Sequence, residues 1–196
     1  LRMVEVLERH GDHQGLNLTT VVRDGIVGHT GAIIPVTLEG QIIRIVDRIA
    51  YLCHDFDDAQ RAGMLTAEAL PFEVREHFGM TPSSMITAMV EDMVRESLDK
   101  PAISMSADVE MTMNLFRQFM FKHVYLAPAL IPDRKKASHV VKNLFTHFME
   151  HPDDMEGCET GKAFYSTRDV VDYVAGLTDQ YAIKLFKQYY IPYITL

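Results

Sequence analysis

The stretch EGQIIRIVDRIAYLCHDFDDAQRAGML, from Glu39 to Leu65, decides how the chain folds. Its apolar residues recur at spacings of three and four, so on an α-helix they gather on one side. This spacing predicts a long helix with that side turned toward a hydrophobic core. The apolar residues are Ile42, Ile45, Val46, Ile49, Leu52, Cys53 and Phe56.

The other side of the predicted helix carries a stripe of polar residues at the same spacings. A solvated face with alternating charges is the simplest interpretation of such a stripe. Solvated faces usually favour Glu and Lys, however, whereas this stretch uses four aspartates, which are poorer helix formers. Because a short carboxylate is a good metal ligand and hydroxyl acceptor, a binding site is the second interpretation. The stripe consists of Asp47, Tyr51, His54, Asp55, Asp58 and Arg61, flanked by Arg44 and Arg48.

Length and composition are those of an ordinary globular protein. The 196 residues suit one domain with at most a small appendage, and 47% of them are hydrophobic and 23% charged. No apolar run approaches the roughly 18 residues that a membrane-spanning helix needs. The charged segment from Leu1 to His10 is not typical of a secretory signal. We therefore expect a soluble protein without a membrane partner.

Charge and cysteine usage narrow the function classes further. The formal net charge of -8 disfavours nucleic acid as the main ligand, because nucleic-acid-binding proteins present basic surfaces to phosphates. Cys53 and Cys158 allow at most one disulfide. Cys53 lies on the apolar side of the predicted helix, where a reduced thiol is expected. This predicts a reducing compartment, the cytoplasm.

Helical periodicity continues along almost the whole chain, and no strand pattern or internal repeat stands out. Residues 1–7 already show helical spacing with no capping residue before them, which predicts a fragment whose first helix begins further upstream. Asn17 or Thr19 is expected to cap a second helix that ends near Gly31. Further helices are predicted over residues 66–79, 82–98, 106–125, 133–150 and 166–191.

Two motifs in the central stretch resemble those of a known family. Asp47-Arg48-Ile49-Ala50-Tyr51 is followed by His54-Asp55-x-Asp57-Asp58-x-x-Arg61-Ala62-Gly63. Together they resemble the last motif of the deoxyguanosine triphosphate triphosphohydrolase family within the HD superfamily. The resemblance extends to His29-Thr30-Gly31, to Phe116-Arg117-x-Phe119 and to the run from Asp172 to Ala182.

The resemblance implies a mainly α fold, a multi-helix HD-domain-like bundle that lacks the N-terminal half of the catalytic domain. Residues 1–65 would form the C-terminal part of the HD catalytic core, and residues 66–196 a helical C-terminal region packing on it. Members of the family are metal-dependent enzymes that cut a deoxynucleoside triphosphate into a deoxynucleoside and inorganic triphosphate. The implied partner is therefore a deoxynucleoside triphosphate, and a homo-oligomer is expected because family members commonly form one.

A divalent metal ion such as Mn²⁺ or Mg²⁺ is implied as the cofactor. The ligands in this superfamily are a His, an adjacent His-Asp pair and a distant Asp, which suit such ions and leave positions open for water. Asp47 matches the distant Asp, whereas the other ligands and the catalytic histidine belong upstream of Leu1. His54-Asp55 does not match the His-Asp pair, because the further histidines required before it are missing. This chain alone is therefore expected to be inactive.

The resemblance also assigns substrate contacts to three residues of the stripe. Arg48 would contact triphosphate oxygens, for which a guanidinium fork is well shaped. Tyr51 would pack on the deoxyribose near its C2 position, and Asp55 would accept a hydrogen bond from the sugar 3′-hydroxyl. Without the resemblance, these three are interpreted as a surface cation, a half-buried core aromatic and a helix-face carboxylate. The Val124-Tyr125 match further suggests that Lys122 and Tyr125 approach the phosphates.

Two other function classes stay open at this point. A helical binding or assembly module could keep the scaffold of the family without its chemistry. An HD phosphodiesterase could act on another nucleotide. Our preferred hypothesis is a portion of a triphosphohydrolase, in which water attacks the α-phosphorus and the metal stabilises the developing charge.

Overall fold

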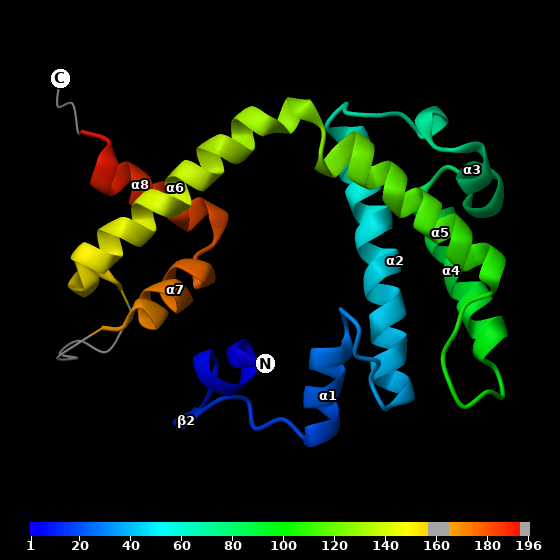
Figure 1. The fold of residues 1–196 in the computed structure, drawn as a ribbon, viewed down its shortest axis with the longest axis horizontal. Coiled ribbons are helices and arrows are strands. Elements are labelled where there is room, and N and C mark those ends of the chain that lie inside the picture. Colours follow the sequence, from blue (N-terminus) through cyan, green and yellow to red (C-terminus); the bar gives the residue numbers. More distant parts are fainter. Residues whose placement is uncertain (157–164, 193–196) are drawn as a thin grey trace. The chain divides into compact units, whose positions relative to one another are not determined.

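The computed structural model describes residues 1–156 and 165–192, and helices dominate this part of the chain (Figure 1). The mainly α fold is confirmed. Its described sheet consists of two paired two-residue strands, β1 (Arg9–His10) and β2 (His13–Gln14), which form a small hairpin near the N-terminus. In the described residues no helix combines the length and the apolar composition that crossing a membrane requires.

The predicted central helix is α2 (Leu38–Arg61), and both of its ends follow from the sequence. The Thr37 side chain accepts a hydrogen bond from Gly40 N, which satisfies a free amide of the first turn. Gly63 follows the end of the helix with a φ of +68°, a conformation that glycine adopts without steric strain. The side of α2 predicted to face the core does so, with Ile45, Ile49, Leu52, Cys53 and Phe56 buried.

The chain divides into two compact units, residues 1–127 and 128–196. In the first unit, α2 packs against α1 (Thr20–Gly28), α4 (Pro82–Ser97) and α5 (Ala107–Met120). A short helix, α3 (Phe72–Phe78), covers α4 and α5. Shorter helical turns complete this unit: η1 (Met3–Leu7), η2 (Ala67–Ala69) and η3 (Phe121–Tyr125).

One continuous core fills the first unit. The rings of Phe56 of α2 and Phe116 of α5 meet edge to face with their centres 5.8 Å apart, and both are fully buried. Burial also raises the pKa of the Cys53 thiol to about 12, so this cysteine stays protonated at neutral pH. Cys53 is a free thiol as expected, whereas Cys158 lies outside the described residues.

A buried carboxylate fixes the start of α5. Asp92 of α4 is 2% exposed, and its oxygens accept hydrogen bonds from Ser106 N and Arg95 Nη2, each at 2.8 Å. Burial acts to raise the pKa of Asp92, but the hydrogen bonds from Ser106 and Arg95 outweigh it, and the pKa is lowered. Ser106, where the predicted helix begins, in turn caps α5 through its side chain. Asp92 thereby fixes the helix that supplies one wall of the candidate site described below.

The second unit is built from α6 (Ile131–Glu150), α7 (Thr167–Gly176) and α8 (Asp179–Tyr190), with short turns η4 (Pro128–Leu130) and η5 (Pro152–Asp154). The prediction of a single helix over residues 166–191 is wrong, because one helix ends at Gly176 and the next begins at Asp179. The Thr178 side chain accepts a hydrogen bond from Tyr181 N and so caps α8. This N-cap favours the start of a new helix over the continuation of α7. The core of this unit contains Leu144, Phe148, Met155, Val170 and Leu185.

The predicted boundary after residue 65 falls inside the first compact unit. Helices α3, α4 and α5 share a core with α2, so the boundary between the two compact units lies later in the chain, after Ala127. The prediction that residues 1–65 belong to a catalytic core concerns function rather than compactness. It therefore stays a prediction.

Candidate functional site

The polar side of α2 opens onto a cavity of about 250 Å³, which we call the arginine cavity. Three segments of the first unit form it: the turn after α1, the middle of α2 and the middle of α5. Three of its lining residues are arginines and one is a carboxylate, so its charge favours an anionic ligand. The lining residues are His29, Thr30, Gly31, Arg44, Asp47, Arg48, Tyr51, Leu52, Met113, Asn114 and Arg117.

Arg44 holds the turn that forms one wall of this cavity. Its Nη1 donates to Gly28 O at 2.7 Å and to Ile33 O at 3.0 Å, and its Nη2 donates to Gly31 O at 2.5 Å. Gly31 has a φ of +78°, which explains why a glycine occupies the turn. Because three of its five N–H donors are engaged with the backbone, Arg44 positions the wall of the cavity.

Arg48 is half-buried and has an unsatisfied donor. Its Nε is buried, and no acceptor among the described residues lies within hydrogen-bonding distance of it. A buried guanidinium N–H without an acceptor is unfavourable, typically by about 1–3 kcal/mol. The guanidinium lines the arginine cavity, so an anionic ligand there could supply the missing acceptor.

Asp47 is exposed and lines the same cavity. Within the described part of the chain it pairs with neither Arg44 nor Arg48, the partners that a purely structural carboxylate would use. An unpaired carboxylate beside three arginines is free to bind a further group. The geometry therefore places Asp47 where a ligand of the cavity could reach it.

Tyr51 lies one turn after Asp47 on the same side of α2. Its ring packs partly on the core of the first unit and partly lines the arginine cavity. Such a half-buried phenol offers a flat apolar surface with a polar end. Tyr51 is therefore the half-buried core aromatic of the first interpretation, and its contact with a deoxyribose stays a prediction.

Asp55 is separated from the cavity wall but linked to a second helix. The phenol of Tyr125 in η3 donates a hydrogen bond to Asp55 Oδ2 at 2.6 Å. Burial and this bond raise the pKa of Tyr125, so the phenol keeps its proton and remains a donor at neutral pH. The sequence predicted that Tyr125 lies near the site, but not that it holds Asp55.

The remainder of the polar stripe forms no site. His54 is exposed, and Arg61 pairs with Asp57 and Asp58 on the last turns of α2. These ion pairs raise the pKa of Arg61 and belong to an ordinary solvated helix face. The stripe therefore divides into a cavity wall around Arg44 to Tyr51 and a solvated end.

Sequence reasoning missed the contribution of α5 and of the turn after α1. Asn114 and Arg117 lie one turn apart on α5 and both line the arginine cavity. The guanidinium of Arg117 lies 5.1 Å from the centre of the Phe121 ring, a cation–π contact that orients it. The available signal was the spacing of three between these two residues, which places them on one side of the helix. His29, the other missed residue, lies directly after α1.

A metal site would need more donors than this cavity offers. Within residues 1–156 and 165–192, no three His, Cys, Asp or Glu side chains come together in a way that could hold a metal ion. Asp47 is a suitable single ligand, but one carboxylate does not bind a divalent ion firmly. The described residues therefore do not form a metal site by themselves.

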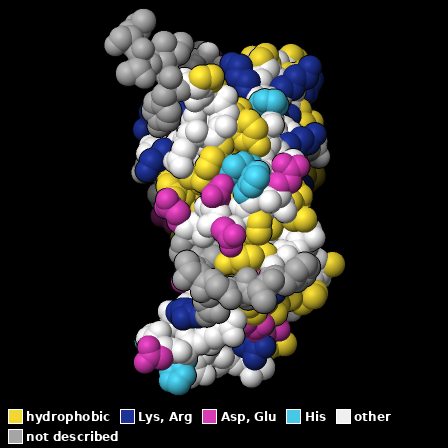
Figure 2. Space-filling view, turned by 90° about the vertical axis from the view of Figure 1, so that its left-hand side faces the viewer, with side chains coloured by type: hydrophobic (Ala, Val, Ile, Leu, Met, Phe, Trp, Pro, Cys, Tyr) yellow, Lys and Arg dark blue, Asp and Glu magenta, His cyan; other side chains and the backbone are white. Residues whose placement is uncertain are grey.

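A second cationic surface lies in the second unit, on α6. A shallow hollow of about 450 Å³ there is lined by basic side chains, and Figure 2 shows Lys and Arg side chains gathered at the top of the face that it displays. Unlike the arginine cavity, this hollow is lined by residues of one helix. The lining residues are Ile131, Arg134, Lys135, Ser138, His139 and Lys142.

Comparison with known proteins finds similar chains over almost the whole length of this one. Residues 103–188 match the family described as "Phosphohydrolase-associated domain". The "Deoxyguanosinetriphosphate triphosphohydrolase-like protein" of Caldanaerobacter subterraneus subsp. tengcongensis is 40% identical over 194 residues, which cover 98% of this chain and 57% of that protein. Proteins of the same name from Clostridium perfringens strain 13 and Clostridium tetani are 35% and 32% identical, over 98% and 100% of this chain and 59% of each relative.

The fold defines a mainly α-helical protein, and the names of its relatives refer to a phosphohydrolase. The resemblance predicted from the motifs is confirmed, because relatives of this name match 98% or more of the chain. The chain spans less than three fifths of the length of these three curated relatives.

Proposed function

We propose that this chain supplies the triphosphate- and sugar-binding part of a metal-dependent deoxynucleoside triphosphate triphosphohydrolase. The reaction would convert a deoxynucleoside triphosphate and water into a deoxynucleoside and inorganic triphosphate. One observation carries the proposal: Arg48, whose buried Nε has no acceptor among the described residues, lines the same cavity as the unpaired Asp47. The names of the relatives point in the same direction.

Two arginines from different helices are available to the phosphates. Arg48 on α2 and Arg117 on α5 both line the cavity, and neither is engaged as fully as Arg44. A guanidinium binds two phosphate oxygens at once, and two guanidinium groups can divide the charge of a triphosphate between them. Asn114 adds a neutral donor and acceptor on the same wall.

The sugar is proposed to lie over Tyr51, toward Asp55. The phenol ring offers an apolar surface to the deoxyribose, where an added 2′-hydroxyl of a ribonucleotide would lose its water without gaining a partner. Asp55 has a free oxygen besides the one that accepts from Tyr125, and this oxygen would accept from the 3′-hydroxyl.

The cavity holds only part of such a nucleotide. Its volume of about 250 Å³ lies below the 300–1,000 Å³ that small-molecule sites usually occupy, which supports a site completed by further polypeptide. In the same way, Asp47 is proposed as one ligand of a divalent metal whose other ligands lie outside the described residues. When bound, such a metal would polarise phosphoryl oxygens.

The test is an assay of the full-length gene product with Mn²⁺ and a deoxynucleoside triphosphate, with the products identified. We expect inorganic triphosphate and a deoxynucleoside. Release of pyrophosphate or of a nucleoside monophosphate would instead support a phosphodiesterase or another hydrolase. Tight nucleotide binding without any product would support a non-catalytic binding module.

A further inference from the structure

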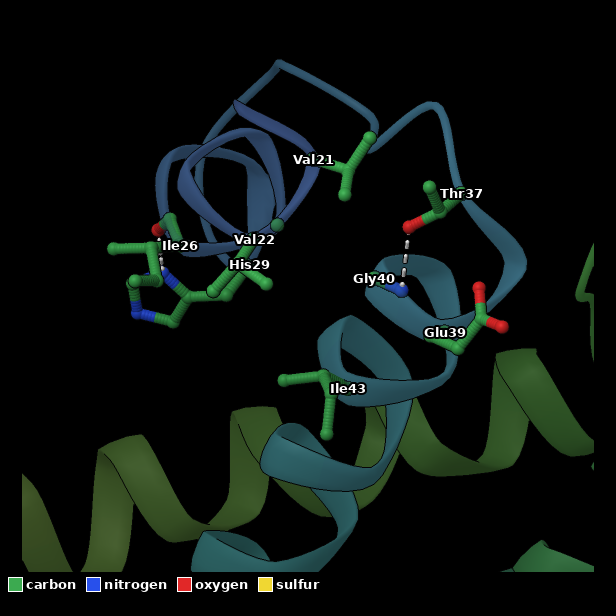
Figure 3. A pocket seen from close by; sticks show the side chains of 9 residues that line it. Val21, Val22, Ile26, His29, Thr37, Glu39, Gly40 and Ile43 are labelled. Carbon is green, nitrogen blue, oxygen red and sulfur yellow. Dashed lines mark hydrogen bonds between the residues drawn. The ribbon is translucent and has the colours of Figure 1, made fainter. Parts of the chain in front are cut away.

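A second cavity of the first unit is apolar and differs from the arginine cavity in its lining. It lies between α1 and the first turns of α2, has a volume of about 780 Å³, and we call it the apolar groove. Figure 3 shows Val21 and Val22 of α1 on one side of it and Ile43 of α2 on the other. The other lining residues are Gly25, Ile26, His29, Thr37, Glu39 and Gly40.

The apolar groove lies in a region with an unusual amount of exposed apolar surface. Ile43 and Val21 are more than half exposed, and next to the groove in the sequence, Ile34 and Val36 are 67% and 74% exposed. Single exposed apolar residues are common, but a contiguous apolar hollow of this size marks an interaction surface in most soluble proteins.

The walls of the apolar groove are held in place by the fold. Gly28 is in such close contact with Pro35 that an added Cβ would lie 2.7 Å from the proline ring. Asp24 Oδ2 accepts a hydrogen bond from Val36 N at 2.8 Å, and Gln41 Nε2 donates to Pro35 O at 3.0 Å. The groove is therefore preformed, so a partner would bind without ordering it first.

Two observations together identify what covers this surface. The curated relatives are longer than this chain, with more than two fifths of the Caldanaerobacter protein outside the match. His29 lines both the apolar groove and the arginine cavity, so the two hollows meet at this residue. Polypeptide bound in the groove would therefore lie beside the cavity in which Asp47 has no partner.

We propose that the apolar groove binds an apolar helix face from the polypeptide that the longer relatives possess and that this chain does not span. Val22 and Ile43 make its main contacts, because they face the hollow from opposite walls. A helix-in-groove contact of this kind requires apolar side chains at helical spacing on the partner.

Co-expression tests this proposal directly. The chain is produced together with the portion of the Caldanaerobacter relative that lies outside the match, and the affinity of the purified pair is measured in the absence of nucleotide and metal. Val22→Asp and Ile43→Asp should each weaken binding more than tenfold, because a carboxylate would be buried without a partner. Met111→Asp is the matched control: this residue of α5 is 66% exposed and lies outside the groove. It should leave the affinity unchanged.

Three results would overturn the proposal. The two polypeptides fail to co-purify, the groove variants bind as well as the Met111 control, or the groove variants abolish only self-association of this chain. Circular dichroism of each variant separates lost binding from lost folding, since all three substituted side chains are exposed. The measurement needs no catalysis, so a failed triphosphohydrolase assay leaves this result standing, and the reverse also holds.

Discussion

The arginine cavity and the apolar groove are neighbours on one helix, yet their linings are opposite in character. The cavity is lined by three arginines, an aspartate and an asparagine, whereas the groove is lined mainly by valines, isoleucines and glycines. Both include His29, and both use α2, where Ile43 lines the groove and Arg44 the cavity. One residue along the helix therefore separates the two surfaces.

On the two proposals, the hollows bind different ligands. A positively charged cavity with an unsatisfied guanidinium selects an anion. An apolar groove with no unsatisfied polar wall selects an apolar polypeptide face. Since the hollows adjoin, the partner in one can complete the site in the other. The substitutions below are expected to affect one hollow, both, or only a shared wall.

Asp47→Asn should have the largest effect, and only on the arginine cavity. Losing a metal ligand should lower triphosphate release by more than about 100-fold, the upper range for residues that merely support a ligand. The assay compares full-length gene products carrying Asp47→Asn or Asp58→Asn, because Asp58 is an exposed carboxylate on the same helix that pairs with Arg61. Equal activities of the two variants would remove Asp47 from the site.

Arg48→Gln should weaken nucleotide binding by about 10- to 100-fold, because a hydrogen bond to a charged group contributes about 1.5–3 kcal/mol. Inorganic tripolyphosphate is the probe, titrated calorimetrically into this chain. Arg61→Gln provides the control from the solvated end of α2. The role of Arg48 is refuted if both variants bind tripolyphosphate with the affinity of the unchanged chain.

Arg44→Ala should damage both hollows at once. The three bonds to the turn after α1 disappear, and the free energy of unfolding should fall by about 2 kcal/mol. Hydrogen exchange should accelerate in residues 28–36, which border the cavity and adjoin the groove. Urea unfolding measures the first effect and mass spectrometry the second. Unchanged exchange in this segment would mean that other contacts hold the turn.

Tyr125→Phe should have a smaller effect at the edge of the arginine cavity. It removes the donor to Asp55 while keeping the ring, so the expected loss is about 1 kcal/mol, or roughly fivefold in KM for a deoxynucleoside triphosphate. Affinity for tripolyphosphate, which has no sugar, should not change. A loss for both ligands would place Tyr125 with the phosphates instead.

Acid should loosen the α5 wall of the cavity before it affects the groove. The pKa of the Asp92 carboxyl is lower in the folded protein than in the unfolded chain. The ionised carboxylate therefore makes its full contribution to the stability of the fold at pH values above the unfolded pKa. That contribution is lost as the pH falls through the lower folded value. Hydrogen exchange at the start of α5 should therefore accelerate below pH 4, and Asp92→Asn should remove this pH dependence. If exchange at the start of α5 showed the same pH dependence in the unchanged chain and in Asp92→Asn, Asp92 would not be the group that fixes this helix.

The sequence predicted the framework better than the site. The core side of α2 and the caps Thr37, Thr81 and Ser106 follow from local patterns, because helical spacing and first-turn hydrogen bonds are decided by nearby residues. The interruption between α7 and α8 was missed, because the apolar spacing continues across Thr178 and only the N-cap at Thr178 marks a new helix.

The contacts that build the site join distant parts of the chain. Asp47, Arg48 and Tyr51 were found because they share one helix and a motif. Arg117 and His29 reach the cavity only through the packing of α5 and α1 on α2, which no local pattern specifies. The apolar groove could not be predicted either, because an apolar residue on a helix is normally assigned to the core.

The central claim, that the arginine cavity holds the nucleotide, is tested most directly by a crystal structure of the full-length gene product with a deoxynucleoside α-thiotriphosphate. We predict phosphate oxygens within hydrogen-bonding distance of Arg48 Nε and Arg117, with the sugar against Tyr51 and its 3′-hydroxyl on Asp55. A nucleotide bound at the basic surface of α6, with Arg48 Nε still lacking an acceptor, would contradict the account.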